Sequence, residues 1–245
     1  MTVLIHGFTN APDDFGNWFQ VLRREGFNVQ TVPFKRDDTV YKSIEVFAKV
    51  LDKQIKNIDK KVSLNLIGFS RGGLVLRYYL QNLYSGERKI NVVITVATPH
   101  AGTNLATLGH VAASVGNFLL KLVNVNALEP AAKTTLPQMS ALLSDFLGKL
   151  NTESAREIYR SIPLLNIWLS KDGVIVPASN ALFPFPEGCN YEIRENITHS
   201  MVLEPPGTRT ILEEVIIPVL RNETVIPRKG PQSIEEWKER QALIN

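Results

Sequence analysis

The stretch from Leu64 to Leu76, with the sequence LNLIGFSRGGLVL, constrains the fold of this chain most strongly. Apolar residues on both sides of a glycine-rich centre predict a buried strand, a very tight turn and a buried helix. Ser70 stands in the turn between Gly68 and Gly72, where a Cβ at either glycine would collide with the facing strand or helix. The start of the helix offers N–H groups and a positive dipole end to an oxygen that gains negative charge. The serine hydroxyl is therefore placed for chemistry.

The pentapeptide Gly-Phe-Ser-Arg-Gly fits the G-x-S-x-G pattern of a nucleophile elbow, a strained turn that exposes its serine. Glycine and serine are also common in ordinary turns, so the pattern alone leaves open a turn that merely contains a serine. A phosphate-binding loop is excluded, because such a loop needs Lys and then Ser or Thr after its last glycine. Here Leu74 and Val75 follow Gly73.

Strands and helices alternate along most of the chain. Helices are expected over Asp13–Glu25, Gly72–Leu83 and about Pro206–Leu220. Strands are expected at Thr2–Ile5, Phe27–Val32, Val62–Ile67, Asn91–Ala97, Pro163–Leu169 and Asn190–Arg194. Several strands are apolar on both faces, which indicates an α/β fold with a mostly parallel sheet covered by helices on both sides. Right-handed crossovers then place the carboxyl ends of all strands on one edge, where ligands bind.

The length of 245 residues fits a single domain. Residues 104–160 interrupt the alternation: they contain no clear strand and are rich in Leu, Ala and Val. A long insertion of this kind forms a helical lid or cap over a site, or it shields a face of the sheet. Residues 221–245 form a mostly polar tail that we expect to dock on the body or fray.

Composition excludes several classes of function. The formal charge of +3 comes without a basic cluster interleaved with aromatic residues, so nucleic-acid binding has no support. Cys189 is the single cysteine, and no Cys/His group has metal-ligand spacing, so neither a metal nor another cofactor is implied. No run of about 18 apolar residues predicts an integral membrane segment. No secretion signal follows Met1, so we expect a cytoplasmic chain, or a secreted one if an export signal has been removed.

A serine hydroxyl is a weak nucleophile and needs a histidine base, which in turn needs an acid. Of the four histidines, His6 and His100 stand beside glycine or proline turns and are interpreted as loop-shaping. His110 lies in the insertion. His199 follows the last strand and is the predicted base.

The predicted acid is Asp172, which follows an earlier strand at the same edge in the turn Ser170-Lys171-Asp172-Gly173. Asp-Gly is also common in plain turns. Other candidates for the acid therefore remain: Asp145, Glu129 and Glu195.

Two N–H donors are needed for the oxyanion of a tetrahedral intermediate. Arg71 follows the nucleophile and is expected to supply one. Phe8, after the first strand, is expected to supply the other. Only the main chain of these residues is required, so their side chains are left for an acyl pocket or, for Arg71, an ion pair with the insertion.

The chain resembles the small lipases of the α/β-hydrolase superfamily, including bacterial triacylglycerol lipases and the glycosylphosphatidylinositol inositol-deacylase group. The matching stretches are VLIHGF, LIGFSRGGLVLRYYL, VATPHAGT, SKDGVIVP and THSMVL, which together span Thr2 to Leu203. Ser70, Asp172 and His199 stand in the chain order of the α/β-hydrolase triad. We expect no strand before VLIHGF, as in the smallest lipases. The resemblance implies hydrolysis of carboxylic esters through an acyl-enzyme.

The leading hypothesis is a lipase or esterase acting on a small-molecule or lipid ester, with transient contact to a lipid interface. A thioesterase or acyltransferase could use the same machinery on another acceptor. A third alternative is an inactive α/β scaffold that binds a lipid or a partner. The sequence does not give the oligomeric state.

Overall fold

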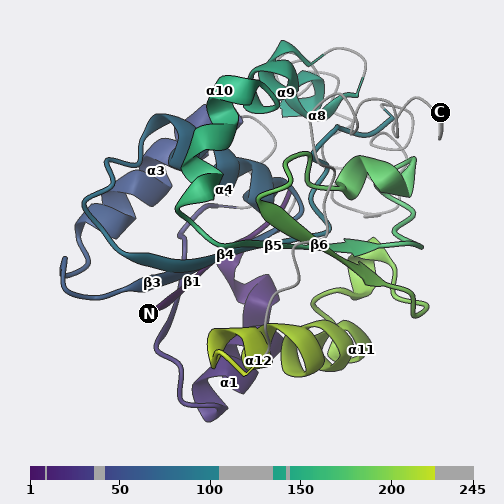
Figure 1. Cartoon of the computed structure of the whole chain (residues 1–245). Helices are drawn as coiled ribbons and strands as arrows, with labels where there is room; N and C mark the ends of the chain where they lie inside the picture. Colours follow the sequence, from purple (N-terminus) through teal and green to yellow (C-terminus); the bar gives the residue numbers. More distant parts are fainter. Residues whose placement is uncertain (9, 36–41, 105–134, 142–143, 224–245) are drawn as a thin grey trace.

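A single sheet of parallel strands forms the centre of the molecule (Figure 1). The computed structural model describes residues 1–8, 10–35, 42–104, 135–141 and 144–223. Its strands are β1 (Thr2–Ile5), β2 (Val29–Thr31), β3 (Leu64–Phe69), β4 (Ile90–Val96), β5 (Leu164–Leu169) and β6 (Gly188–Ile193). The order across the sheet is β2-β1-β3-β4-β5-β6, and every neighbouring pair is parallel. The predicted α/β class and parallel sheet are confirmed.

The central strands are buried on both faces because helices cover both sides of the sheet. Side chains along a strand point alternately to the two faces, so each strand contributes to two cores. In β1, Val3 and Ile5 pack into one core while Leu4 packs into the other. In β3, Leu64 and Leu66 pack into the same core as Val3 and Ile5. The apolar residues that alternation predicts for one strand thus hold two helical layers to the sheet.

One layer consists of α3 (Ile44–Lys56) and α4 (Arg71–Asn82), which pack against each other above the sheet in Figure 1. The opposite layer contains α1 (Gly16–Arg24), which follows the short turn of helix η1 (Pro12–Phe15). The remaining elements of that layer are α11 (Pro205–Gly207), η5 (Thr208–Ile216) and α12 (Ile217–Leu220).

The elements α11, η5 and α12 together correspond to the helix predicted over about Pro206–Leu220, and their middle part is a π-helix. Pro218 lies just beyond that part, in α12. A proline has no N–H to donate and its ring crowds the carbonyl one turn earlier. Widening of the preceding turns accommodates such a residue without breaking the helix.

The described part of the predicted insertion at 104–160 is helical. It contains α8 (Thr135–Met139), α9 (Asp145–Leu150), α10 (Glu153–Arg156) and η2 (Glu157–Arg160). Residues 105–134 and 142–143 lie outside the described residues, as does most of the predicted tail, 224–245. A lid or cap role for the insertion therefore stays a prediction.

The strand order contains one point at which the direction of the crossover connections changes. Successive strands run from β1 to β2 on one side, and from β3 to β6 on the other. The crossover direction therefore reverses between the neighbours β1 and β3. In open parallel sheets ligands bind at such a point, beyond the carboxyl ends of the strands. His6 to Phe8 follow β1 at this point, and Ser70 follows β3.

Candidate active site

Ser70 connects β3 to α4 in a backbone conformation that side chains rarely adopt. Its φ is 54° and its ψ is −125°. Tight packing holds this strained turn, since a Cβ on Gly68 would lie 2.7 Å from the backbone of Gly72, and one on Gly72 would lie 2.2 Å from the carbonyl oxygen of Ile5. The hydroxyl is therefore presented at the carboxyl edge of the sheet, and the predicted strand, turn and helix are confirmed.

Ser70, His199 and Asp172 form one hydrogen-bonded line. His199 Nε2 lies 2.9 Å from Ser70 Oγ. On the other side of the ring, His199 Nδ1 lies 2.9 Å from Asp172 Oδ2 and 3.0 Å from its Oδ1. An ionised carboxylate has no proton to donate, so the ring proton lies on Nδ1 of His199. Nε2 of the same ring then accepts from the serine hydroxyl. The structure brings together the three residues that the sequence predicted.

Asp172 follows β5 and its side chain is fully buried. Its Oδ1 accepts the N–H groups of Val174 at 2.9 Å and Ile175 at 2.7 Å, while the N–H of His199 donates to its carbonyl oxygen at 3.0 Å. Gly173 completes the turn at a φ of +75°. The two N–H groups fix the orientation of the carboxylate.

The loop after β1 lies directly against the nucleophile. A Cβ built on Gly7 would stand 2.9 Å from the Cβ of Ser70. This contact places the main chain leading to Phe8 beside the serine. On the other side, Arg71 begins α4, and the first N–H groups of a helix have no acceptor within it. Both predicted oxyanion donors thus belong to segments that meet at Ser70.

The side chain of Arg71 points toward the start of α3. Its Nη2 donates to the carbonyl oxygen of Lys42 at 2.7 Å, and its guanidinium carbon lies 4.4 Å from the centroid of the Phe47 ring. Burial lowers the pKa of Arg71, and the nearby carboxylate of Glu45 opposes that shift. The guanidinium therefore ties the nucleophile's helix to α3.

Of the other histidines in the described residues, neither His6 nor His100 hydrogen-bonds to the serine. His6 is buried, with its Nε2 3.1 Å from the carbonyl oxygen of Phe34 and its Nδ1 3.2 Å from that of Gly7. Burial lowers the pKa of His6, so it is neutral at pH 7. Its contacts agree with the predicted loop-shaping role. His110 lies outside the described residues.

His100 does more than shape a loop, because it belongs to a buried polar network that the sequence analysis missed. Arg77 Nη1 donates to Nδ1 of His100 at 3.3 Å. Nε2 of His100 donates to Asn166 Oδ1 at 3.1 Å. The hydroxyl of Thr95 also donates to Asn166 Oδ1, at 2.8 Å. Burial and the charge of Arg77 hold the pKa of His100 well below its ordinary value. The signal in the sequence was a charged residue inside the apolar run LVLRYYL, which requires buried acceptors.

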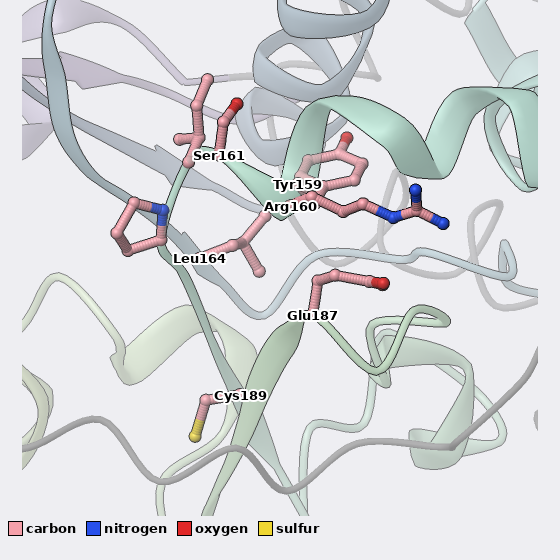
Figure 2. Close-up of a pocket in the computed structure, with 8 residues that line it drawn as sticks. Tyr159, Arg160, Ser161, Leu164, Glu187 and Cys189 are labelled. Carbon is pink, nitrogen blue, oxygen red and sulfur yellow. The ribbon is translucent and has the colours of Figure 1, made fainter.

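A cavity of about 230 Å³ lies elsewhere, between the end of η2 and the start of β6. Figure 2 shows Tyr159, Leu164, Glu187 and Cys189 among the residues around it. Leu164 begins β5 and Cys189 is the second residue of β6, so the cavity opens at the amino edge of the sheet. Ser70 leaves the carboxyl edge, and the cavity is therefore separate from the line of three residues.

In the part of the chain that the structure describes, no three His, Cys, Asp or Glu side chains gather as metal ligands. Within the same residues, no helix combines the length and the apolar character needed to span a bilayer.

Comparison with known protein families shows to which family this chain belongs. Residues 1–200 match the family described as palmitoyl protein thioesterase. The chain belongs to this family. Ser70, Asp172 and His199 all lie within the residues that match the palmitoyl protein thioesterase family.

The family member also resembles lipases, as its sequence predicted. Triacylglycerol lipase 2 of Saccharomyces cerevisiae is 41% identical over 71 residues, which are 26% of this chain and 22% of the yeast protein. The chain thus matches less than a quarter of that relative's length.

Two solved structures have the same fold as this palmitoyl protein thioesterase family member. Both are of Bacillus licheniformis lipase BlEst2, with 15% identity. The mature form has a TM-score of 0.63 and covers 89% of this chain and 91% of its own. The propeptide form has a TM-score of 0.67, covering 94% of this chain and 52% of its own. The predicted α/β-hydrolase fold is confirmed.

Proposed function

We propose that this chain is a serine hydrolase that cleaves carboxylic esters through an acyl-enzyme on Ser70. The observation that carries the proposal is the continuous hydrogen-bonded line from Ser70 Oγ through the His199 ring to the Asp172 carboxylate. A strained turn presents the serine at the strand edge, and this is the arrangement that nucleophilic acyl transfer needs.

In the first half-reaction, Ser70 Oγ attacks the ester carbonyl carbon while its proton passes to His199 Nε2. Asp172 keeps the other ring proton on Nδ1 and stabilises the imidazolium that forms. The carbonyl oxygen becomes negative, and the main-chain N–H groups of Phe8 and Arg71 are the donors proposed for it. His199 then gives its proton to the leaving alcohol.

In the second half-reaction, His199 takes a proton from water, and the resulting hydroxide attacks the acyl carbon. As the tetrahedral intermediate collapses, the bond between Ser70 Oγ and the acyl carbon breaks, and His199 returns its proton to Oγ, which releases the carboxylic acid and the free serine. No step requires a metal or an organic cofactor, because the three side chains supply the base, the acid and the nucleophile.

The proposed substrate class is an ester with an apolar acyl group. Support comes from the insertion at 104–160, whose sequence is rich in Leu, Ala and Val. Transient contact with a lipid interface is part of this proposal. Activity that rises sharply once the ester or an added detergent forms micelles would support it, and a preference for short, freely soluble esters would argue for an esterase.

A thioester is the second candidate substrate, favoured by the family match over residues 1–200. The same attack on a thioester carbonyl releases a thiol in place of an alcohol. Matched palmitoyl oxyesters and thioesters separate the two. A larger kcat/KM for the oxyester supports the leading proposal, and a larger value for the thioester supports the second. Transfer of the acyl group to an added alcohol would indicate an acyltransferase.

Replacement of the nucleophile tests the proposal. Ser70→Ala should lower turnover of a p-nitrophenyl acyl ester by roughly three orders of magnitude or more, because the acyl-enzyme can no longer form. Ser154→Ala changes an exposed serine in α10 and should leave turnover unchanged. A folded Ser70→Ala variant that keeps full activity would refute the role of Ser70. An inactive wild-type protein would favour the binding scaffold.

A further inference from the structure

A threonine from a distant part of the chain holds the loop that carries the proposed catalytic acid. Thr103 follows β4 and is 1% exposed. Its Oγ1 donates to the carbonyl oxygen of Val174 at 2.7 Å and accepts the N–H of Val176 at 3.0 Å. The single hydroxyl therefore bridges the two peptide groups on either side of Ile175.

The same loop residues cradle the carboxylate of Asp172. Its Oδ1 accepts the N–H groups of Val174 and Ile175. Val174 is thus bonded on one side to Asp172, through its N–H, and on the other to Thr103, through its carbonyl oxygen. Because a peptide unit is planar and rigid, the position of Thr103 bears directly on where the N–H groups of the cradle point.

Thr103 is itself anchored by its main chain. Its N–H donates to the carbonyl oxygen of Met139 at 2.8 Å, and its carbonyl oxygen accepts the N–H of Ala141 at 3.1 Å. Gly102 permits this close approach with a φ of +85°, since a Cβ there would lie 2.5 Å from the nitrogen of Ala141. The threonine is a fixed point at which segments 101–103 and 139–141 meet the loop of the acid.

We propose that Thr103 is a positioning residue for the reaction, which orients Asp172, and through it His199, by holding the Val174–Val176 backbone. This inference rests on the role of Asp172 in the proposed function. The hydroxyl of Thr103 donates to one peptide group and accepts from the next with the same oxygen atom. Valine has a similar shape but leaves both peptide groups without their partner, whereas serine keeps both bonds.

Two substitutions separate positioning from simple support of the fold. Thr103→Val should lower kcat for a p-nitrophenyl acyl ester by roughly ten- to a hundredfold while KM changes less than about threefold, since misplacement of a catalytic group costs rate rather than binding. Thr103→Ser should stay within about threefold of the wild type. Thr95→Val removes another buried hydroxyl, one bonded to Asn166 in the sheet, and serves as the matched control for lost stability.

A double-mutant cycle identifies the residue through which Thr103 acts. If Thr103 works by orienting Asp172, then adding Thr103→Val to Asp172→Asn should lower kcat by less than about threefold further, because residues that act as a unit are not additive. A Thr103→Val variant with the kcat of the Thr95→Val control would overturn the proposal, as would a full additional loss in the Asp172→Asn background. An Asp172→Asn enzyme as active as the wild type would instead overturn the proposed function.

Discussion

His199 Nε2 and Ser70 Oγ lie 2.9 Å apart although 129 positions of sequence separate the two residues. Ser70 ends the turn after β3, and His199 begins η4 (His199–Met201), which follows β6. The aromatic ring of Phe69 packs at 5.0 Å from the imidazole and supports its orientation. The distance is therefore a product of the parallel sheet, which gathers the carboxyl ends of its strands on one edge.

Asp172→Asn should disable the enzyme while leaving the fold intact. The asparagine amide can donate to His199 Nδ1, which favours the wrong tautomer of the ring. A loss of roughly three to four orders of magnitude in kcat is expected. Glu195→Gln is the matched control, since Glu195 is exposed near His199 and was an alternative acid in the sequence. Turnover of a soluble ester by both variants checks the assignment, and a larger loss in Glu195→Gln would reverse it.

Gly72→Ala should destabilise the protein because the added Cβ meets backbone. It would lie 2.2 Å from the carbonyl oxygen of Ile5 and 2.8 Å from that of His6. We expect the free energy of unfolding to fall by roughly 3 kcal/mol or more.

Gly148→Ala provides the control for that substitution. Gly148 is exposed in α9 with nothing within 4 Å of the new Cβ, so a gain of roughly 0.5–1 kcal/mol is expected there. Urea denaturation compares the two variants. Equal effects would show that the elbow has more room than the structure indicates.

The stability of the fold should fall as the pH is lowered from about 6.5 to about 5, above the range where ordinary carboxylates titrate. Burial and the charge of Arg77 lower the pKa of His100, so the folded protein keeps it neutral while the unfolded chain binds a proton. The contribution of His100 to the free energy of unfolding is fully present above the pKa that this histidine has in the unfolded chain. Below that pKa the contribution falls, by at most about 1.4 kcal/mol per pH unit for one histidine.

His100→Gln should reduce the slope of the free energy of unfolding against pH in this window. Part of the slope should persist, because burial lowers the pKa of His6 in the same direction. Urea melts of both proteins at several pH values provide the measurement. A slope that the substitution leaves unchanged would contradict a neutral, buried His100.

The sequence was sufficient for the sheet and for the three residues in line. Strands apolar on both faces predicted a parallel sheet, and in such a sheet residues just beyond strands share an edge. Ser70, Asp172 and His199 each follow a strand, so the parallel topology brings them to one edge of the sheet. The chain order of the α/β-hydrolase triad was also needed, because Glu195 follows a strand as well. The bounds of β3 and α4 also lie close to the predicted ones, because Gly68 and Gly72 mark the turn between them.

The sequence could not give interactions that depend on packing between distant segments. Thr103 was not singled out, since nothing local to VATPHAGT indicates that its hydroxyl reaches Val174 and Val176. The contacts of His100 were missed for the same reason. Its partners Arg77 and Asn166 come from α4 and β5, and only the fold shows which buried groups they satisfy.

The most direct test of the proposed mechanism is the reaction of the folded protein with a fluorophosphonate probe, followed by mass spectrometry of the peptides. The hydrogen-bonded line activates a single hydroxyl, so one adduct on Ser70 is expected, formed much more slowly in a His199→Gln variant. A folded wild-type protein that remains unlabelled, or an adduct on any other residue, would contradict the account.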